Sequence, residues 1–282
     1  MAIAEHQLEV GKLTWFYREV EPAHESNRLP VLLLHGLVAQ SYSWRGVLPV
    51  LAEQGFRAIA PDWIGHGYSS WPDKRDFPYT AEAFVTALAE FIEALGLERF
   101  HLVVQGFLGT VGLQYALRNP DRVERLVILN APIVPEAKLP WKIKQFGIPL
   151  VGDMLTQDPL LVDRTLEGGG PYQVDDADLD IYRRPFLKSS DAGRALLATV
   201  QGLNLAKVTA EIAAGLPQWQ HPTLLIWGVD DPWLPVSLAE SCVGNLQDGE
   251  LTKLDQVGHY GQEDWAEKVA EALSPFLRKM AV

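Results

Sequence analysis

The chain has 282 residues, of which 48% are apolar, and its 36 Asp and Glu outnumber its 24 Lys and Arg to give a formal net charge of −12. This length is sufficient to bury one large hydrophobic core. The acidic balance argues against nucleic acid and against an anionic membrane surface as main partners, because both are themselves anionic.

Cysteine content and apolar runs constrain the compartment. The single cysteine, Cys242, excludes an intrachain disulfide and fits a reducing environment. The segment 1–10 contains Glu5 and Glu9 and lacks the long apolar run of a secretory signal. The longest apolar stretches, such as 31–34, are too short to cross a bilayer. We therefore expect a soluble, cytoplasmic protein. No spacing of potential ligands predicts a metal site, and no cofactor is expected.

Strand-like and helix-like segments alternate along most of the chain. The pair 11–12 resembles a tight turn before an aromatic and β-branched stretch, which predicts an N-terminal hairpin. A continuously apolar run, typical of a strand buried on both faces, follows at 30–34, and further largely apolar strands are expected at 56–60, 100–104, 123–129 and 223–227. Amphipathic helices are expected at 80–96, 108–118 and 264–279. This alternation predicts βαβ units and a mostly parallel sheet with helices on both faces.

The segment 132–217 interrupts this pattern. It is rich in proline, includes the glycine run 168–170, and has helical fragments between these breaks. Because it lies between two buried strands, it is predicted to be an inserted helical lid. The remaining segments, 1–131 and 218–282, would then form one α/β core.

Ligands of open α/β sheets bind beyond the carboxyl ends of the strands, so the residues that follow each predicted strand are candidates for a site. They are 35–37, 62–63, 105–107, 130, 228–232 and 258–259.

Several of these segments carry motifs of a known superfamily. They are Leu-Leu-Leu-His-Gly at 32–36 with Ser-Tyr-Ser-Trp-Arg at 41–45, Ala-Pro-Asp-Trp-Ile-Gly-His-Gly-Tyr-Ser at 60–69, Pro-Thr-Leu-Leu-Ile-Trp-Gly-Val-Asp-Asp-Pro at 222–232, and Val-Gly-His-Tyr at 257–260. In this order they resemble the α/β-hydrolase fold, and most of all its haloalkane dehalogenase and epoxide hydrolase branch. The resemblance covers most of the chain outside 132–217. It implies a mostly parallel, eight-stranded sheet with helices on both faces and a helical lid.

The resemblance also implies roles for individual residues. The superfamily arranges its catalytic groups in the order nucleophile, acid, histidine. Asp231, three residues after Gly228, matches the acid, and His259 matches the base. The backbone N–H groups of Leu37 and Phe107 match the positions that bind a developing oxyanion.

The nucleophile position departs from the family pattern. Aligning 103–107 with the dehalogenase-like pattern Val-Val-Gln-Asp-Trp places Gly106 on the sharp turn after the strand 100–104. Glycine has no side chain with which to attack carbon. Phe107 lacks the indole N–H of the halide-binding tryptophan, and Leu37 stands where that branch often has a polar residue. The sequence thus predicts the loss of both the nucleophile and the halide site.

Two interpretations of Gly106 stay open at this stage. It either satisfies a backbone that requires positive φ, or it marks an active site with altered chemistry. An engineered loss of the nucleophile fits less well, because Val104 and Leu108 also depart from the small residues of the family pattern. For Asp231 and His259, the motif and the chain order favour a true acid–base pair over an unrelated acidic turn and loop histidine.

Four further residues are candidates for the pocket. Gln105 is either a polar pocket group or a brace for the turn. The tryptophans near strand ends either line the pocket or pack in the core, and they are Trp44, Trp63 and Trp233.

Two functions are compatible with these residues. The first is a binding or regulatory protein that holds a small, mostly apolar ligand under the lid. The second is an enzyme in which His259 activates water or abstracts a substrate proton without a covalent intermediate, in hydrolysis, hydration or lyase chemistry. The sequence names neither the ligand nor any protein partner.

Overall fold

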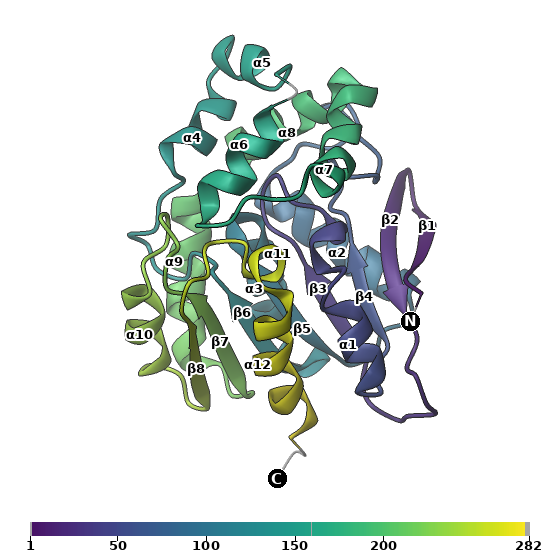
Figure 1. Ribbon diagram of the computed structural model, residues 1–282, viewed down its shortest axis with the longest axis vertical. Coiled ribbons are helices and arrows are strands. Elements are labelled where there is room, and N and C mark those ends of the chain that lie inside the picture. Colours follow the sequence, from purple (N-terminus) through teal and green to yellow (C-terminus); the bar gives the residue numbers. More distant parts are fainter. Residues whose placement is uncertain (1, 159, 280–282) are drawn as a thin grey trace.

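One eight-stranded sheet organises the protein, for which a computed structural model describes residues 2–158 and 160–279 (Figure 1). The strand order is β1-β2-β4-β3-β5-β6-β7-β8. The strands are β1 (Ala4–Val10), β2 (Leu13–Val20), β3 (Val31–Leu34), β4 (Ala58–Pro61), β5 (Phe100–Gln105), β6 (Val123–Leu129), β7 (Thr223–Gly228) and β8 (Gly249–Leu254). β1 pairs antiparallel with β2, and β2 with β4, whereas all later pairs are parallel. The predicted fold, a mostly parallel eight-stranded sheet with helices, is confirmed.

Helices cover both faces of the sheet because both faces of its central strands are apolar. In β3, Val31 and Leu33 join one buried cluster, and Leu32 and Leu34 join the other. The first cluster packs under α1 (Leu48–Glu53) and α12 (Ala266–Arg278). The second packs under α2 (Ala81–Ala94) and α3 (Gly106–Arg118). This two-sided burial explains why these strands read as continuous apolar runs.

Two predicted helices differ in their boundaries. α3 begins at Gly106, directly after β5, rather than at residue 108. The expected helix 264–279 corresponds to α12, which begins at Ala266 and is preceded by the short helix α11 (Gly261–Asp264). The start of α2 is as predicted, since the Thr80 hydroxyl accepts a hydrogen bond from the N–H of Ala83.

The segment 132–217 is mainly helical and lies largely above the carboxyl ends of the strands (Figure 1). Its helices are α4 (Trp141–Lys144), α5 (Val151–Leu155), α6 (Leu161–Leu166), α7 (Asp176–Lys188), α8 (Ser190–Gly202) and α9 (Leu205–Gly215). α9 differs from the others because it packs beside α3 of the core. A lid function of 132–217 stays a prediction. Residues 280–282, at the end of the predicted core segment 218–282, lie outside the described residues.

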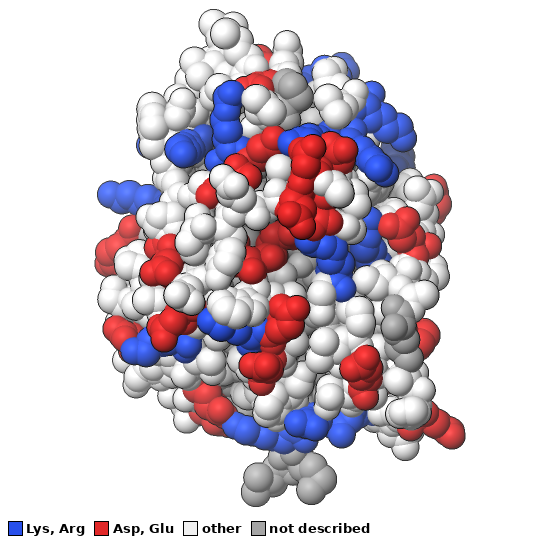
Figure 2. Space-filling model, in the orientation of Figure 1, with Lys and Arg blue, Asp and Glu red and all other residues white. Residues whose placement is uncertain are grey.

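A charged cluster joins this segment to the core. The Arg45 guanidinium forms two hydrogen bonds of 2.7 Å with the carboxylate of Glu263 in α11 and also contacts Asp178 in α7. The hydroxyl of Tyr182, also in α7, donates to Glu263. The side chain of Glu263 is only 4% exposed, so its charge depends on these partners. Figure 2 shows acidic side chains gathered over α7, whose first turn carries Asp176 and Asp178.

The exposed end of 132–217 should be the first part of the protein to be cut by trypsin. Lys138, Lys142 and Lys144 are exposed, and α4, which contains the last two, has only four residues, so local opening breaks few hydrogen bonds. We expect the first fragments in a limited digest, identified by mass spectrometry, to end at these lysines. First cuts within 30–131 would contradict this prediction.

Removing the charge of Arg45 should destabilise the fold more than removing the charge of Arg118, which lies at the surface. Arg45→Met leaves the buried carboxylate of Glu263 without its cation, and we expect the free energy of unfolding to fall by about 3 kcal/mol. Arg118 also contacts two glutamates, Glu82 and Glu211, but these are 58% and 32% exposed. Arg118→Met should therefore cost less than about 1 kcal/mol. Urea denaturation of the two variants tests the difference, and equal losses would refute it.

Candidate active site

The predicted acid and base meet beyond the carboxyl ends of the strands. Nδ1 of His259 lies 2.8 Å from Oδ2 of Asp231, although the two residues are 28 positions apart in the chain. Both side chains are buried. A carboxylate only accepts hydrogen bonds, so Nδ1 carries the proton and Nε2 is the basic nitrogen of the neutral ring.

Asp231 is held by three further donors. Its Oδ1 accepts hydrogen bonds from the N–H groups of Trp233 at 2.8 Å and Leu234 at 3.0 Å. Its Oδ2 accepts one from the amide of Asn130 at 2.8 Å. These bonds fix the orientation of the carboxylate toward the imidazole.

Asn130 is a site residue to which sequence reasoning gave no role. It follows β6, has a positive φ of 40°, and its Oδ1 accepts the N–H of Gly228 at 2.8 Å while its amide donates to Asp231. It thus ties the end of β6 to the turn that carries the acid. The available signal was a polar residue directly after a buried strand.

Gly106 lies on a sharp turn with positive φ between β5 and α3, as predicted for this position. Its φ is +67°, in the region that glycine adopts without steric cost. A Cβ added there would lie 3.2 Å from Nε2 of His259 and 3.0 Å from Cα of Gly36. A side chain at this position would therefore face the base, and either neighbour would have to shift slightly to accept it. The backbone requirement for glycine is real, and the direction of the turn matches the implied catalytic geometry.

Gln105 braces the turn and is not a pocket group. Its Oε1 accepts the N–H of Gly36 at 2.9 Å, and its Nε2 donates to the carbonyl oxygen of His259 at 2.9 Å. The side chain is fully buried between these two loops. Of the two roles that the sequence allowed, the structure supports the brace.

The two candidate oxyanion donors each follow a glycine, and these two glycines, Gly36 and Gly106, pack closely against each other. Leu37 comes after Gly36, and Phe107 comes after Gly106 in the first turn of α3, where N–H groups have no acceptor within the helix. Within 2–158 and 160–279, neither N–H donates a hydrogen bond to a protein acceptor. The carbonyl of Leu37 accepts the hydroxyl of Tyr260 at 3.0 Å, which fixes the loop.

Aromatic rings surround the imidazole of His259. The ring of Phe107 stacks on it at a centroid distance of 5.2 Å, and the centroids of Trp233 and Tyr260 lie at 4.8 and 4.9 Å. The imidazole therefore lies in an apolar environment, in which hydrogen bonds to charged groups are stronger than in water.

Two of the three candidate pocket tryptophans pack in the core instead. Trp44 is fully buried in the cluster under α1 and α12. Trp63 donates its indole N–H to the carbonyl of His35 at 2.9 Å and packs edge-on against Phe84. Both side chains fill the layers beside the sheet, where their large apolar area is buried. Only Trp233 contacts His259.

Comparison with known proteins agrees with this geometry. Residues 30–173 match the α/β-hydrolase fold family. The chain belongs to that family. Haloalkane dehalogenase 2 of Mycobacterium tuberculosis is 28% identical over 251 residues, which cover 86% of each chain. A cis-3-alkyl-4-alkyloxetan-2-one decarboxylase of Shewanella oneidensis is 28% identical over 90% of this chain and 83% of its own. The crystal structure of haloalkane dehalogenase DbeA from Bradyrhizobium elkani superimposes with a TM-score of 0.85 at 25% identity, over 98% of both chains.

These comparisons support the predicted resemblance to the haloalkane dehalogenase branch of the α/β hydrolases. In the described ranges, no helix has the length and apolarity needed to cross a membrane. Nor do 2–158 and 160–279 contain a group of three or more His, Cys, Asp or Glu placed to hold a metal ion.

In this α/β hydrolase the glycine run of 132–217 packs directly on the histidine loop. The carbonyl of Gly169 accepts the N–H of His259 at 2.6 Å. A Cβ added at Gly258 would lie 2.3 Å from Cα of Gly170, so neither backbone leaves room for a side chain. The sequence identified the run only as a break between helices; its contact with Gly258 brings together residues 88 positions apart.

Asp264 lies at the same contact. Its Oδ2 accepts the N–H of Gly258 at 2.8 Å, and burial raises the pKa of its carboxyl to about 6. At neutral pH the carboxylate is therefore held in a poorly solvated position beside the histidine loop.

Asp264 should make stability depend on pH in a defined direction. Between about pH 4 and pH 6 the folded protein keeps a proton that the unfolded chain has lost, so the stability contribution of this group falls as pH rises. Asp264→Asn keeps an acceptor for Gly258 and removes the charge. Its free energy of unfolding, relative to the wild type, should rise by at most about 3 kcal/mol from pH 4 to pH 7.

The exposed Asp255 provides the control for this measurement. Asp255→Asn should show no such change in relative stability between the two pH values. A constant difference between Asp264→Asn and the wild type would overturn the assignment of a raised pKa.

Proposed function

We propose that this protein is an α/β-hydrolase-family enzyme that uses His259 as a general base on a small, mostly apolar substrate, without a covalent enzyme intermediate. The proposal rests on one observation: Nδ1 of His259 is bound to Asp231, whereas Nε2 faces the backbone of Gly106. The basic nitrogen is thus aimed at the position from which the family's nucleophile would act.

In the proposed mechanism, Nε2 of His259 takes a proton from water or from a carbon or oxygen of the substrate. Asp231 stabilises the imidazolium that forms, and the N–H groups of Leu37 and Phe107 bind the negative charge that develops on oxygen. General-base catalysis of this kind contributes roughly 10²–10⁴-fold, so the reaction must be intrinsically easy or assisted by positioning.

Other hydroxyl groups near the turn are engaged elsewhere. The hydroxyl of Thr110 donates to the carbonyl of Phe107 at 2.7 Å, within α3. The hydroxyl of Ser41 accepts a 2.7 Å hydrogen bond from Arg18. Both polar atoms of the Gln105 side chain are also hydrogen-bonded. Thr110, Ser41 and Gln105 are therefore poorly placed to replace a nucleophile.

The names of the relatives limit the reaction class. Two of the three are dehalogenases, but the side chain of Phe107 has no N–H with which to bind a departing halide, so we do not assign dehalogenation to this chain. The Shewanella relative is by name a decarboxylase of oxetan-2-ones. This supports a lyase reaction as well as a hydrolysis among the chemistries of the proposed enzyme.

The second candidate is a protein that binds a small apolar ligand without converting it. The lack of a side chain at Gly106 and the close fit of His259 against this turn favour it. In this case Asp231 and His259 would serve to order the loop at 257–260, and a bound ligand would be recovered unchanged.

The covalent step is open to a direct test. Active-site phosphonates should leave the wild-type protein unlabelled, as measured by intact-mass spectrometry, because Gly106 offers no attacking atom. Gly106→Ser places a hydroxyl toward Nε2 of His259 and should form a stoichiometric adduct at residue 106, provided that circular dichroism shows a folded variant. An adduct on the wild type, or a folded Gly106→Ser that stays unlabelled, would contradict the proposed geometry.

The same samples distinguish the two candidate functions. On a panel of small esters, lactones and epoxides, His259→Ala should lower any turnover by roughly 10²-fold or more, and the control His221→Ala should not. Turnover that survives His259→Ala would refute the general-base role. A ligand that binds the wild type and is recovered unchanged would favour the binding protein.

A further inference from the structure

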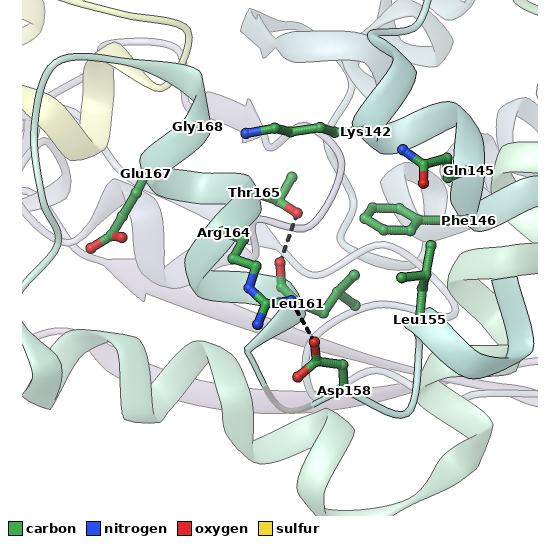
Figure 3. Close-up of a pocket in the computed structure, with 10 residues that line it drawn as sticks. All are labelled: Lys142, Gln145, Phe146, Leu155, Asp158, Leu161, Arg164, Thr165, Glu167 and Gly168. Atoms are coloured by element: carbon green, nitrogen blue, oxygen red, sulfur yellow. Dashed lines mark hydrogen bonds and ion pairs between the residues drawn. The ribbon is translucent and has the colours of Figure 1, made fainter. Parts of the chain in front are cut away.

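A cavity of about 420 Å³ lies within the 132–217 segment, between α4, α5 and α6 (Figure 3). Its apolar wall includes Phe146, Leu155 and Leu161, and its polar wall includes Lys142 and Thr165. This volume is within the range of small-molecule sites, roughly 300–1,000 Å³.

The charges around the cavity leave one cation without a partner. Arg164 and Asp158 neutralise each other at 2.7 Å. Glu167 points away from the ammonium group of Lys142, which extends across the cavity toward Gly168 (Figure 3). Among the described residues, no carboxylate lies within 4.0 Å of this ammonium. Lys142 therefore presents an ammonium group, without a carboxylate partner, beside an apolar wall.

The cationic end of the cavity is the end nearer to the proposed active site. Nζ of Lys142 is 3.5 Å from the position of a Cβ at Gly168, and that position is 4.0 Å from Cζ2 of Trp233. The ring of Trp233 in turn contacts His259 at a centroid distance of 4.8 Å. One indole ring therefore separates a molecule bound at Lys142 from the general base.

The outer surface of the same elements is unusually apolar. The large apolar side chains that are exposed to solvent include Trp141, Leu150, Val151, Met154 and Leu160. They lie in or directly before α4, α5 and α6, the helices that contribute other residues to the cavity wall. Exposed apolar patches of this kind mark binding sites for apolar molecules.

We propose that this cavity binds an amphipathic organic acid, whose anionic group pairs with Lys142 and whose apolar chain packs against Phe146, Leu155 and Leu161. Because Trp233 lies between the cavity and His259, this site is separate from the proposed active site, and the proposal concerns binding alone.

Calorimetry with three matched probes tests the proposal: n-decanoate, n-decanol and n-decylammonium. The wild type should bind decanoate more tightly than decanol and should bind decylammonium most weakly. Lys142→Met keeps the length and apolarity of the side chain and removes its charge. It should weaken decanoate binding about three- to fivefold, as expected for a partly exposed ion pair, and leave decanol binding unchanged.

Lys144 is the control, since it lies on the same short helix but does not line the cavity. Lys144→Met should bind all three probes as the wild type does, and added salt should weaken only the binding of decanoate. Decanoate binding that is absent, equal to that of decanol, or unchanged in Lys142→Met would overturn the proposal.

His259→Ala separates this inference from the proposed function. It should bind decanoate like the wild type, because Trp233 lies between His259 and the cavity. Decanoate binding without any His259-dependent turnover would refute the enzyme and leave the acid site standing. If turnover depends on His259 but decanoate binds Lys142→Met as tightly as the wild type, the acid site alone is refuted.

Discussion

The close approach of two strand-end turns, at Gly36 and Gly106, sets the geometry of the whole site. A Cβ at either residue would lie 3.0 Å from Cα of the other, so a side chain at either position would require a neighbour to shift slightly. Gln105 holds them together through Gly36 and fixes the histidine loop through the carbonyl of His259. The N–H groups that follow the two glycines are thereby brought to one place, and the imidazole faces them.

The 132–217 segment is part of this arrangement because it touches the histidine loop directly. Gly169 accepts the N–H of His259, and Arg45 connects α7 to Glu263, only four residues after that histidine. A displacement of the segment would break a backbone hydrogen bond of the base itself. The position of 132–217 and the orientation of His259 are therefore mechanically linked through short contacts, which gives a ligand in the cavity a physical route to the site.

The sequence was most informative where a residue's environment is local. Central strands were predictable because both faces are apolar, and the acid and base because their motifs follow strand ends. The position of β8 was not predicted, because its partly exposed sequence Gly-Glu-Leu-Thr-Lys-Leu at the sheet edge lacks a continuous apolar run. Roles that depend on distant partners were not decidable. Gln105 contacts residues 69 and 154 positions away, and the indole of Trp63 finds its acceptor 28 positions away.

The two departures from the dehalogenase pattern, at neighbouring positions, have one chemical consequence. Displacement of a halide by a carboxylate creates an ester and a free anion, so it needs both an attacking side chain and a donor for the anion. Glycine at position 106 has no side chain that could attack, and the ring of Phe107, which stacks on His259, has no N–H to donate. Neither change disturbs the hydrogen bonds of Asp231 or the direction of Nε2. Of the elementary steps that the family pattern implies, proton transfer at Nε2 is the one for which every required group is still in place.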